Sequence, residues 1–368
     1  MDRSLNLNAS DLTTEAGWIA KMKTAPGSYA DAVEVTTLLG ALQLRRADAG
    51  QFRESLVVAQ GAGQETISVD AAKFATLLKE TYQARKGSGE YAELGVADER
   101  LAMERAGRTV LLRASATDPT PWPNFTPTAD PAILGVGQVT AALVAVGSDP
   151  TLPMLTAVAF DDGSMVATDR FRMTRIRYDD SGFTTLVPGE ALRAIVTPGV
   201  EIIRVQPGTS RDDKGRDTDM VRLTSASRSI IAPVPDVTFP NWRQLIPDTA
   251  AVSVMLRRDD LLAAIGGENV TLTVAVTEAG GALRLCSSDD DVEIEQSIRV
   301  DMLAGGGELP FTVKLRTKYL LEYLRSSASG VVRLDATTPL KPVVFMDPTE
   351  NYVHLIMPIR TPAATPSG

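Results

Sequence analysis

The chain has 368 residues and a mass of 39.3 kDa, which exceeds one hydrophobic core of ordinary size and indicates two or three domains. Hydrophobic residues make up 44% and charged residues 23%, as in soluble globular proteins, and no apolar run approaches the roughly 18 residues of a membrane span. The N-terminal residues lack the charged-then-apolar order of a secretory signal. We therefore expect a cytoplasmic protein with no membrane partner.

The charge and the rare residue types exclude several kinds of site. The net charge is 37 − 46 = −9, so any nucleic-acid partner must meet basic residues gathered on one inner or concave face. The single cysteine, Cys286, excludes an internal disulfide and a cysteine-based zinc cluster. The single histidine, His354, excludes a histidine-rich metal site and would have to serve in any Ser-His-Asp triad.

Catalytic motifs are scarce along the chain. The run "SSDDDVEIE" at 287–295 gathers carboxylates as a metal site does, but it lies between two strand-like segments and is better interpreted as a charged hairpin tip. Neither a phosphate-binding G-x-x-x-x-G-K-[ST] nor a G-x-G-x-x-G pattern occurs. We expect no enzyme activity, no metal and no cofactor.

In chain order, the sequence predicts one series of elements three times: a helix, a hairpin region, a second helix and a second hairpin. The first series occupies 13–24, 40–59, 67–80 and 99–114. The second occupies 135–147, 156–178, 185–198 and 219–234. The third occupies 257–267, 270–300, 313–326 and 330–347, and an alternating strand follows at 351–360. Proline-rich links at 121–131 and 239–251 mark the ends of the first two series.

The second helices share an apolar entry residue followed by apolar residues at offsets 5, 8 and 9, which form one helical stripe. These residues are Val69, Phe74, Leu77 and Leu78; Val187, Leu192, Ile195 and Val196; and Leu315, Leu320, Tyr323 and Leu324. The entry residues are 118 and 128 positions apart, so the unit recurs about every 120 residues. We predict an α+β fold of three similar domains, each with two helices packed on antiparallel sheets, at 1–127, 128–250 and 251–361, and a disordered tail at 362–368.

Five motifs resemble a known family in order and spacing: "VATDRFRM", "FPNWRQLIP", "LRTKYLLEYL", "VRLDATTPLKPVVF" and "YVHLIMPIR". Together they are similar to the bacterial DNA polymerase III beta subunit, the replicative sliding clamp. The resemblance implies a head-to-tail homodimeric ring of six similar domains, with helices lining a central hole and sheets outside. It also implies a non-catalytic processivity factor that encircles duplex DNA without sequence preference and binds polymerase and clamp-loader peptides.

By match of motif, the resemblance also implies a hydrophobic peptide-binding pocket that straddles domains two and three. Its expected lining is Leu155, Thr168, Arg170, Phe171, Arg172, Met173, Pro240, Leu245, Arg316, Tyr319, Leu340, Pro342, Leu355, Ile356, Met357, Pro358, Ile359 and Arg360. The alternative for the arginines at 170, 172 and 175 is that they are ordinary solvated positions on a strand.

Basic residues on the helices are candidates to face DNA. Helical geometry of about 100° per residue puts Lys79, Lys318 and Arg325 opposite the core stripe, with Arg193 at its border, and Lys21 and Lys23 extend the set from the opening helix. Ordinary solvated surface charges are the alternative for each residue.

The chain departs from the family pattern at Arg170, Phe171, Gln244 and Thr361, which is consistent with a divergent or phage-encoded member. An alternative function is a clamp-fold peptide-binding protein that does not encircle DNA, such as a decoy or an immunity factor.

Overall fold

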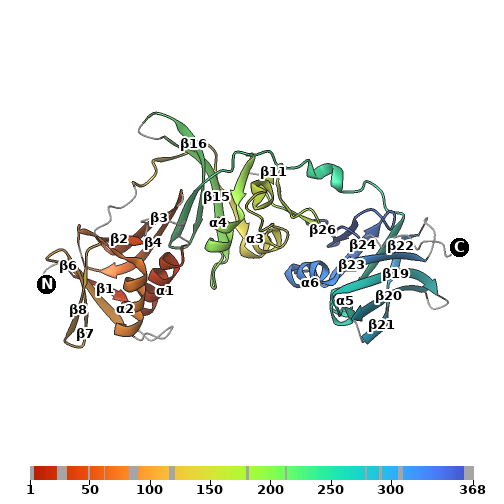
Figure 1. Ribbon diagram of the computed structural model, residues 1–368, viewed down its shortest axis with the longest axis horizontal. Helices are drawn as coiled ribbons and strands as arrows, with labels where there is room; N and C mark the ends of the chain where they lie inside the picture. The colour runs from red at the N-terminus through yellow and green to blue at the C-terminus, as the bar shows by residue number, and fades with distance from the viewer. Residues whose placement is uncertain are drawn as a thin grey trace. The chain divides into compact units, whose positions relative to one another are not determined.

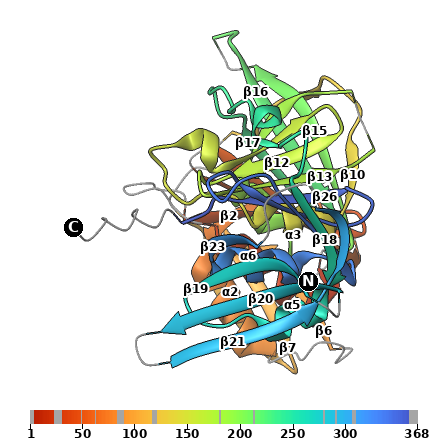
Figure 2. The same ribbon diagram turned by 90° about the vertical axis from the view of Figure 1, so that its right-hand side faces the viewer.

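The computed structural model describes residues 4–22, 31–48, 50–61, 63–82, 90–115, 121–179, 182–211, 214–277, 280–289, 292–305 and 310–359. Runs of antiparallel strands separate the helices along the chain (Figure 1), and Figure 2 shows the same elements after a quarter turn. Contacts divide the chain into two compact units, each described by itself below. The first unit comprises Met1–Pro131 and Ile202–Val234, and the second comprises Ala132–Glu201 and Pro235–Gly368.

The first unit packs two helices against antiparallel strands. The helices are α1 (Ala9–Ala20) and α2 (Ala71–Tyr82), which contact each other. One sheet path runs through β15 (Ile202–Arg211), β16 (Asp217–Ser225), β17 (Arg228–Pro233), β4 (Gln51–Gln60), β1 (Leu5–Asn8), β6 (Tyr91–Ala97), β7 (Arg100–Arg105) and β8 (Arg108–Arg113). The strands that pair beside this path are β2 (Ala32–Leu38), β3 (Ala41–Asp48), β5 (Thr66–Asp70) and β9 (Phe125–Pro127). Side chains such as Leu12, Phe74 and Leu78 are fully buried in its core.

The second unit contains two antiparallel sheets and the remaining described helices. The helices are α3 (Val136–Leu143), α4 (Gly189–Ile195), α5 (Arg258–Ala264) and α6 (Thr317–Ser326), with short 3-10 turns η1 (Pro153–Leu155) and η2 (Trp242–Leu245). The longer sheet has the order β14 (Thr185–Pro188), β11 (Ala157–Asp161), β12 (Ser164–Thr168), β13 (Arg172–Arg177), β26 (Tyr352–Ile356), β25 (Val343–Met346), β24 (Val331–Ala336), β18 (Val252–Arg257) and β22 (Asp301–Gly305). The shorter sheet has the order β21 (Val292–Arg299), β20 (Gly280–Asp289), β19 (Asn269–Thr277) and β23 (Phe311–Arg316). A further strand, β10 (Ala132–Gly135), leads directly into α3.

The predicted repeat is present in the element order. A strand leads directly into each helix, as β1–α1, β5–α2, β10–α3, β14–α4, β18–α5 and β23–α6. In the described part of the chain, four strands separate the two helices of the first and second repeats, and five separate those of the third. The predicted core stripes are buried except at Leu77 and Val196, which are half-buried. These observations confirm the α+β prediction.

The first helix begins earlier than the sequence pattern predicts. It starts at Ala9 because the Asn8 side chain accepts hydrogen bonds from the backbone amides of Ser10 (2.9 Å) and Asp11 (3.2 Å) and so caps the helix. An asparagine cap directly after a strand carries no apolar signal, so the periodicity alone missed this first turn. Among the helices of the described ranges, none is both long and apolar enough to span a membrane.

Residues 128–250, predicted as the second domain, contribute to both compact units. In the first unit, β17 pairs with β4, and Arg228 forms a buried ion pair with Glu15 at 2.8 Å. In the second unit, β13 pairs with β26 from the C-terminal end of the chain. Strands β17 and β13 of the predicted domain thus pair with segments outside it that belong to different contact units, and the three domain boundaries stay a prediction.

Candidate functional site

The candidate site lies in the second unit, where three strands end beside one another. The β13–β26 register pairs Arg172 with Ile356, and the next backbone hydrogen bond runs from the Met357 amide to the Phe171 carbonyl at 2.8 Å. On the other side of β26, Ile356 is paired with Val343, so Pro342 continues the row opposite Met357. Phe171 and Met357 remain 55% and 40% exposed. The register thus brings two exposed apolar side chains from distant segments into neighbouring positions.

A tight turn between β12 and β13 positions Phe171. The Asp169 carboxylate accepts hydrogen bonds from the backbone amides of Phe171 and Arg172, both at 3.0 Å, and the Thr168 hydroxyl donates to the Arg172 carbonyl at 2.8 Å. Arg170 has φ +77°, in the left-handed region that favours glycine. The turn therefore keeps a conformation suited to glycine while presenting a long cationic side chain to solvent, and Asp169 stabilises it locally.

Arg172 connects this turn to α6. Its side chain is 8% exposed and forms ion pairs with Asp169, at 2.9 Å, and with Glu322. The guanidinium carbon also lies 4.5 Å from the centre of the Tyr319 ring. A buried guanidinium that contacts two carboxylates and an aromatic ring is not an ordinary solvated position on a strand, so that alternative is wrong for Arg172. Its charges are satisfied within the protein, and we infer that it holds the turn and α6 together.

The segment before β18 is attached to β11, the strand that pairs with β12 on the side away from β13. The Trp242 indole and the Arg243 guanidinium both donate to the Asp161 carboxylate, at 2.9 and 2.6 Å. The hydrogen bond from Arg243 is the main reason that the pKa of Asp161 lies below its ordinary value. Trp242 is buried in an apolar cluster with Met173 and Leu355, whereas Pro240 and Leu245 on either side of it stay exposed. The tryptophan and arginine of this motif are therefore anchors, and its proline and leucine are available to a ligand.

The predicted pocket residues fall into three groups by exposure. The exposed ones are Arg170, Phe171, Pro240, Leu245, Arg316, Leu340 and Met357. The half-buried ones are Tyr319, Pro342, Pro358 and Ile359, and the buried ones are Leu155, Thr168, Arg172, Met173, Leu355 and Ile356. Arg360 lies outside the described residues, as does the tail at 362–368. Exposed apolar groups thus lie next to a buried apolar layer, as a groove for short peptides requires.

Several supporting residues were missed by the sequence interpretation. Glu322, Asp161 and Trp242 were not predicted as parts of this region. Asp169 carried a usable signal, because aspartate before a turn commonly accepts hydrogen bonds from the amides two and three residues later. Glu322 carried none, since its partner Arg172 is 150 positions away in the sequence.

The candidate DNA-facing residues are exposed wherever the structure describes them. Lys79 lies on α2, Arg193 on α4, and Lys318 and Arg325 on α6, while Lys21 is the C-cap of α1. Lys23 lies outside the described residues. Within the second unit, α3 contacts both α4 and α6. Arg193 donates to the Val146 carbonyl at 3.4 Å, and partial burial lowers its pKa.

The residues weighed as catalytic are poorly placed for chemistry. His354 is completely buried and stacked on Tyr323 at 5.3 Å between ring centres, so no substrate reaches it. The strands β20 and β21 pair up to Asp289 and Val292, which makes the acidic run a hairpin end as predicted. Within the described ranges, no group of three or more His, Cys, Asp or Glu side chains is arranged to hold a metal ion.

Element order, sheet topology and repeat together define a three-fold repeated α+β clamp fold. No family model matches the chain. It is 25% identical over 246 residues to the beta sliding clamp of Streptomyces coelicolor, an alignment that covers 59% of this chain and 62% of that relative. This similarity confirms the resemblance to the sliding clamp, over somewhat less than two thirds of the relative's length.

Solved structures of bacterial DNA polymerase III beta subunits share the fold along almost the whole chain. The beta subunit of Streptococcus pyogenes superposes with a TM-score of 0.77 at 15% identity, covering 97% of this chain and 100% of that one. The Helicobacter pylori clamp bound to a DNA ligase peptide gives 0.77 at 14% identity, with 97% and 100% covered. The Bartonella birtlesii clamp bound to griselimycin gives 0.77 at 16%, with 98% and 100% covered. The chain therefore has the fold of the DNA polymerase III beta subunit.

Burial of His354 makes stability sensitive to acid. Burial lowers the pKa of His354 from 6.5 to about 3, so below pH 6.5 the unfolded chain binds a proton that the folded chain excludes. The free energy of unfolding should fall as the pH drops from 6.5 towards 3, by up to about 1.4 kcal/mol per pH unit from this residue. Chemical unfolding of the wild type and His354→Phe across this range measures the difference. Parallel pH profiles for the two proteins would contradict the assignment.

Proposed function

We propose that the protein is a DNA sliding clamp. Two copies close head to tail into a ring of six domains, with boundaries at 1–127, 128–250 and 251–361 in each chain, and the ring encircles duplex DNA in the cytoplasm. It has no catalytic role and holds a polymerase, a clamp loader and other partners by their peptides. The observation that carries the proposal is the fold, which matches beta subunits over 97–98% of this chain and 100% of the clamps compared.

Peptide capture is supported by the row of Phe171, Met357 and Pro342 together with the exposed Leu245 and Leu340. Leu245 and Leu340 are 43% and 69% exposed. The large exposed hydrophobic residues of the described second unit are Ile133, Phe171, Leu245, Leu340 and Met357, and all except Ile133 belong to the predicted pocket. A methionine and leucines adapt to the apolar side chains of several different peptides, which suits a surface with many partners. The apolar side chains provide contact area, while the buried Arg172 network holds their supporting turn before a ligand arrives.

Sequence-blind contact with DNA is supported by lysines and arginines on helices. Lysine and arginine contacts to phosphates supply affinity without base readout, and a chain of net charge −9 keeps this affinity weak. Lys318 has only a distant ion pair with Glu322, at 3.9 Å, and its ammonium group stays exposed. Such contacts permit sliding, because no single position on the duplex is preferred.

Ring closure requires two complementary edges, which we assign to β8 and β21. Each is the terminal strand of its sheet, β8 in the first unit and β21 in the second. An exposed strand edge is a template for pairing with another chain. The sequence of β8 contains Arg108 and Arg113 and no acid, and that of β21 contains Glu293, Glu295 and Arg299, so the two strands have net charges of opposite sign. Opposite charges on the two strands favour pairing between copies over pairing of like edges.

The topological link to DNA is the first test. A clamp loaded on nicked circular DNA should stay bound through gel filtration and should dissociate after a restriction enzyme linearises the circle. Linear DNA with both ends blocked by streptavidin is the control and should retain the protein. Equal retention on open linear DNA and on circles would contradict encirclement, and failure to remain on either would favour a clamp-fold protein that does not encircle DNA.

The helix charges provide a second test. Replacing Lys79, Lys318 and Arg325 together by glutamate should weaken DNA association and flatten its dependence on salt, by about one unit of slope per lost phosphate contact. Lys214, Arg216 and Lys341 are exposed outside the helices, so their triple glutamate variant has the same charge change and serves as the control. Fluorescence anisotropy with labelled duplex at several salt concentrations gives the slope. Equal slopes for the two triple variants would show that other residues contact DNA.

The apolar row provides a third test. Met357→Ala and Phe171→Ala should each weaken the binding of a polymerase-derived peptide ending in Leu-Phe by about fivefold or more, because truncating a central anchor costs about 1 to 4 kcal/mol of binding. Ile133→Ala is the matched control, since Ile133 is 60% exposed in the same unit and is not among the predicted pocket residues. Anisotropy titration of a labelled peptide measures the affinities. If all three variants bind as the wild type does, the pocket lies elsewhere.

A further inference from the structure

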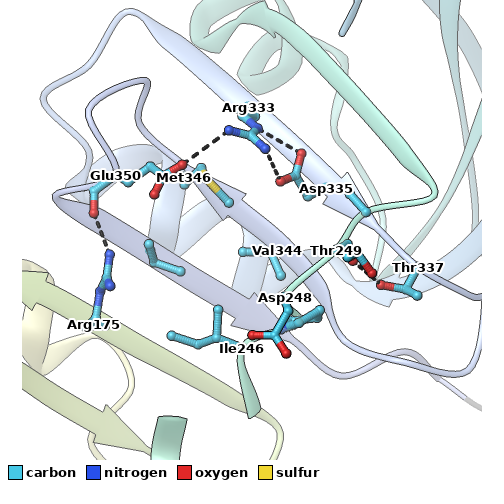
Figure 3. Close-up of a pocket in the computed structure, with 13 residues that line it drawn as sticks. Arg175, Ile246, Asp248, Thr249, Arg333, Asp335, Thr337, Val344, Met346 and Glu350 are labelled. Carbon is cyan, nitrogen blue, oxygen red and sulfur yellow. Dashed lines mark hydrogen bonds and ion pairs between the residues drawn. The ribbon is translucent and has the colours of Figure 1, made fainter. Parts of the chain in front are cut away.

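A cavity apart from the candidate peptide site lies beside the segment that follows η2 (Figure 3). Its volume is about 200 Å³, and it is enclosed by residues of β13, β24, β25, β26 and the segment 246–250. The lining residues are Arg175, Ile246, Pro247, Asp248, Thr249, Ala250, Arg333, Asp335, Thr337, Val344, Met346, Glu350 and Val353. None of them belongs to the predicted peptide pocket, so the cavity is a separate feature of the second unit.

The sheet register determines the floor of this cavity. Arg175 is paired with Val353, Val353 with Met346, and Met346 with Arg333. One row across four strands therefore has a guanidinium at each end and two apolar side chains between them. Val344 extends the apolar part of the floor. Ile246, in the segment after η2, packs against the apolar cluster that contains Val344, Met346 and Val353 (Figure 3). The centre of the floor is thus apolar and its two ends are cationic.

The two guanidinium groups differ in their electrostatic environment. Arg333 pairs with the Asp335 carboxylate at 2.7 Å and with the Glu350 carboxylate at 3.3 Å. Arg175 instead donates to the backbone carbonyl of Glu350 at 2.5 Å, and the ion pairs of the described residues do not include it. Its Nε atom is buried and has no hydrogen-bond partner in the described part of the chain. Burial, and then the nearby Arg177, lower the pKa of Arg175, and the more weakly acting carboxylates of Glu350 and Asp347 offset only part of this. Since an arginine side chain stays protonated in proteins, this environment leaves a positive charge that an anion would stabilise.

The acidic side chains of the lining do not favour a cationic ligand instead. Asp335 and Glu350 already share Arg333. Asp248 is exposed, so water solvates its carboxylate. Arg175, at the edge of an apolar floor, is therefore the lining arginine that no described carboxylate contacts as an ion pair.

We propose that this cavity binds a small apolar group carrying a carboxylate, with the carboxylate on Arg175 and the apolar body over Val353, Met346 and Val344. A cavity of about 150 Å³ can hold a benzene-sized molecule, so about 200 Å³ accommodates a leucine-sized side chain. The C-terminal residue of a peptide and a free short-chain acid share this chemistry. The inference goes beyond the clamp function and does not depend on it.

Methyl NMR of methionine-labelled protein tests this inference at the cavity itself. Met346 lines the cavity and Met357 belongs to the other site, so two methyl signals distinguish the two locations. The Met346→Leu variant assigns the first signal. N-acetyl-L-leucine should shift the Met346 signal saturably, with a dissociation constant of about millimolar order, whereas the neutral N-acetyl-L-leucinamide should not. Once the signal is assigned, this comparison of the two ligands is made on the wild-type protein.

Arginine variants then test the charge. Arg175→Gln should weaken N-acetyl-L-leucine by about tenfold or more, while Arg257→Gln, which removes an exposed charge outside the cavity, should not. Titration with 3-methylbutanoate distinguishes a peptide C-terminus from a free short-chain acid as the ligand. Weaker binding than that of N-acetyl-L-leucine indicates a peptide terminus, and equal binding indicates a free acid. Equal shifts with the acid and the amide, no saturation at Met346, or unchanged affinity in Arg175→Gln would each overturn the proposal.

Discussion

The pairing of β13 with β26 is the constraint on which both candidate sites of the second unit depend. The two strands come from segments about 180 residues apart in the sequence, and their register pairs Arg172 with Ile356 and Arg175 with Val353. At the end of this pairing, Phe171 meets Met357, and within it Arg175 faces a cavity. A slip of one residue would turn every side chain of one strand to the other face and would remove both arrangements together.

The register is supported by charges that are expensive to bury singly. Arg172 is held by Asp169 in the adjoining turn and by Glu322 on α6. Removing either carboxylate would leave a buried guanidinium only partly compensated, which is far more costly than losing an exposed ion pair. The same network holds Arg170 in a left-handed conformation that a non-glycine residue adopts at a cost of about 1 to 3 kcal/mol. The buried charges thus stabilise a locally strained turn whose outermost side chain, Phe171, is apolar and exposed.

Periodic features of this fold were predictable from the sequence, and long-range ones were not. The second helix of each repeat followed from its apolar stripe, and hairpins followed from turn residues such as Asp162 and Gly163, which both adopt positive φ. The first helix begins earlier than predicted, because the Asn8 cap that starts it does not contribute to the apolar periodicity. Motif resemblance supplied the residues of the candidate peptide site, yet it could not show that Arg172 is buried while Phe171 is exposed, since the decisive partner Glu322 lies in a remote segment. The role of Arg175 depended on a cavity that has no local sequence signal.

The central claim is that two copies of the chain form one closed ring. Sedimentation velocity combined with class averages from electron microscopy measures mass and shape in one sample. The account predicts a species of about twice 39.3 kDa whose averages show a closed ring with an open centre. A species of 39.3 kDa at all concentrations, or a dimer without a central hole, would contradict it.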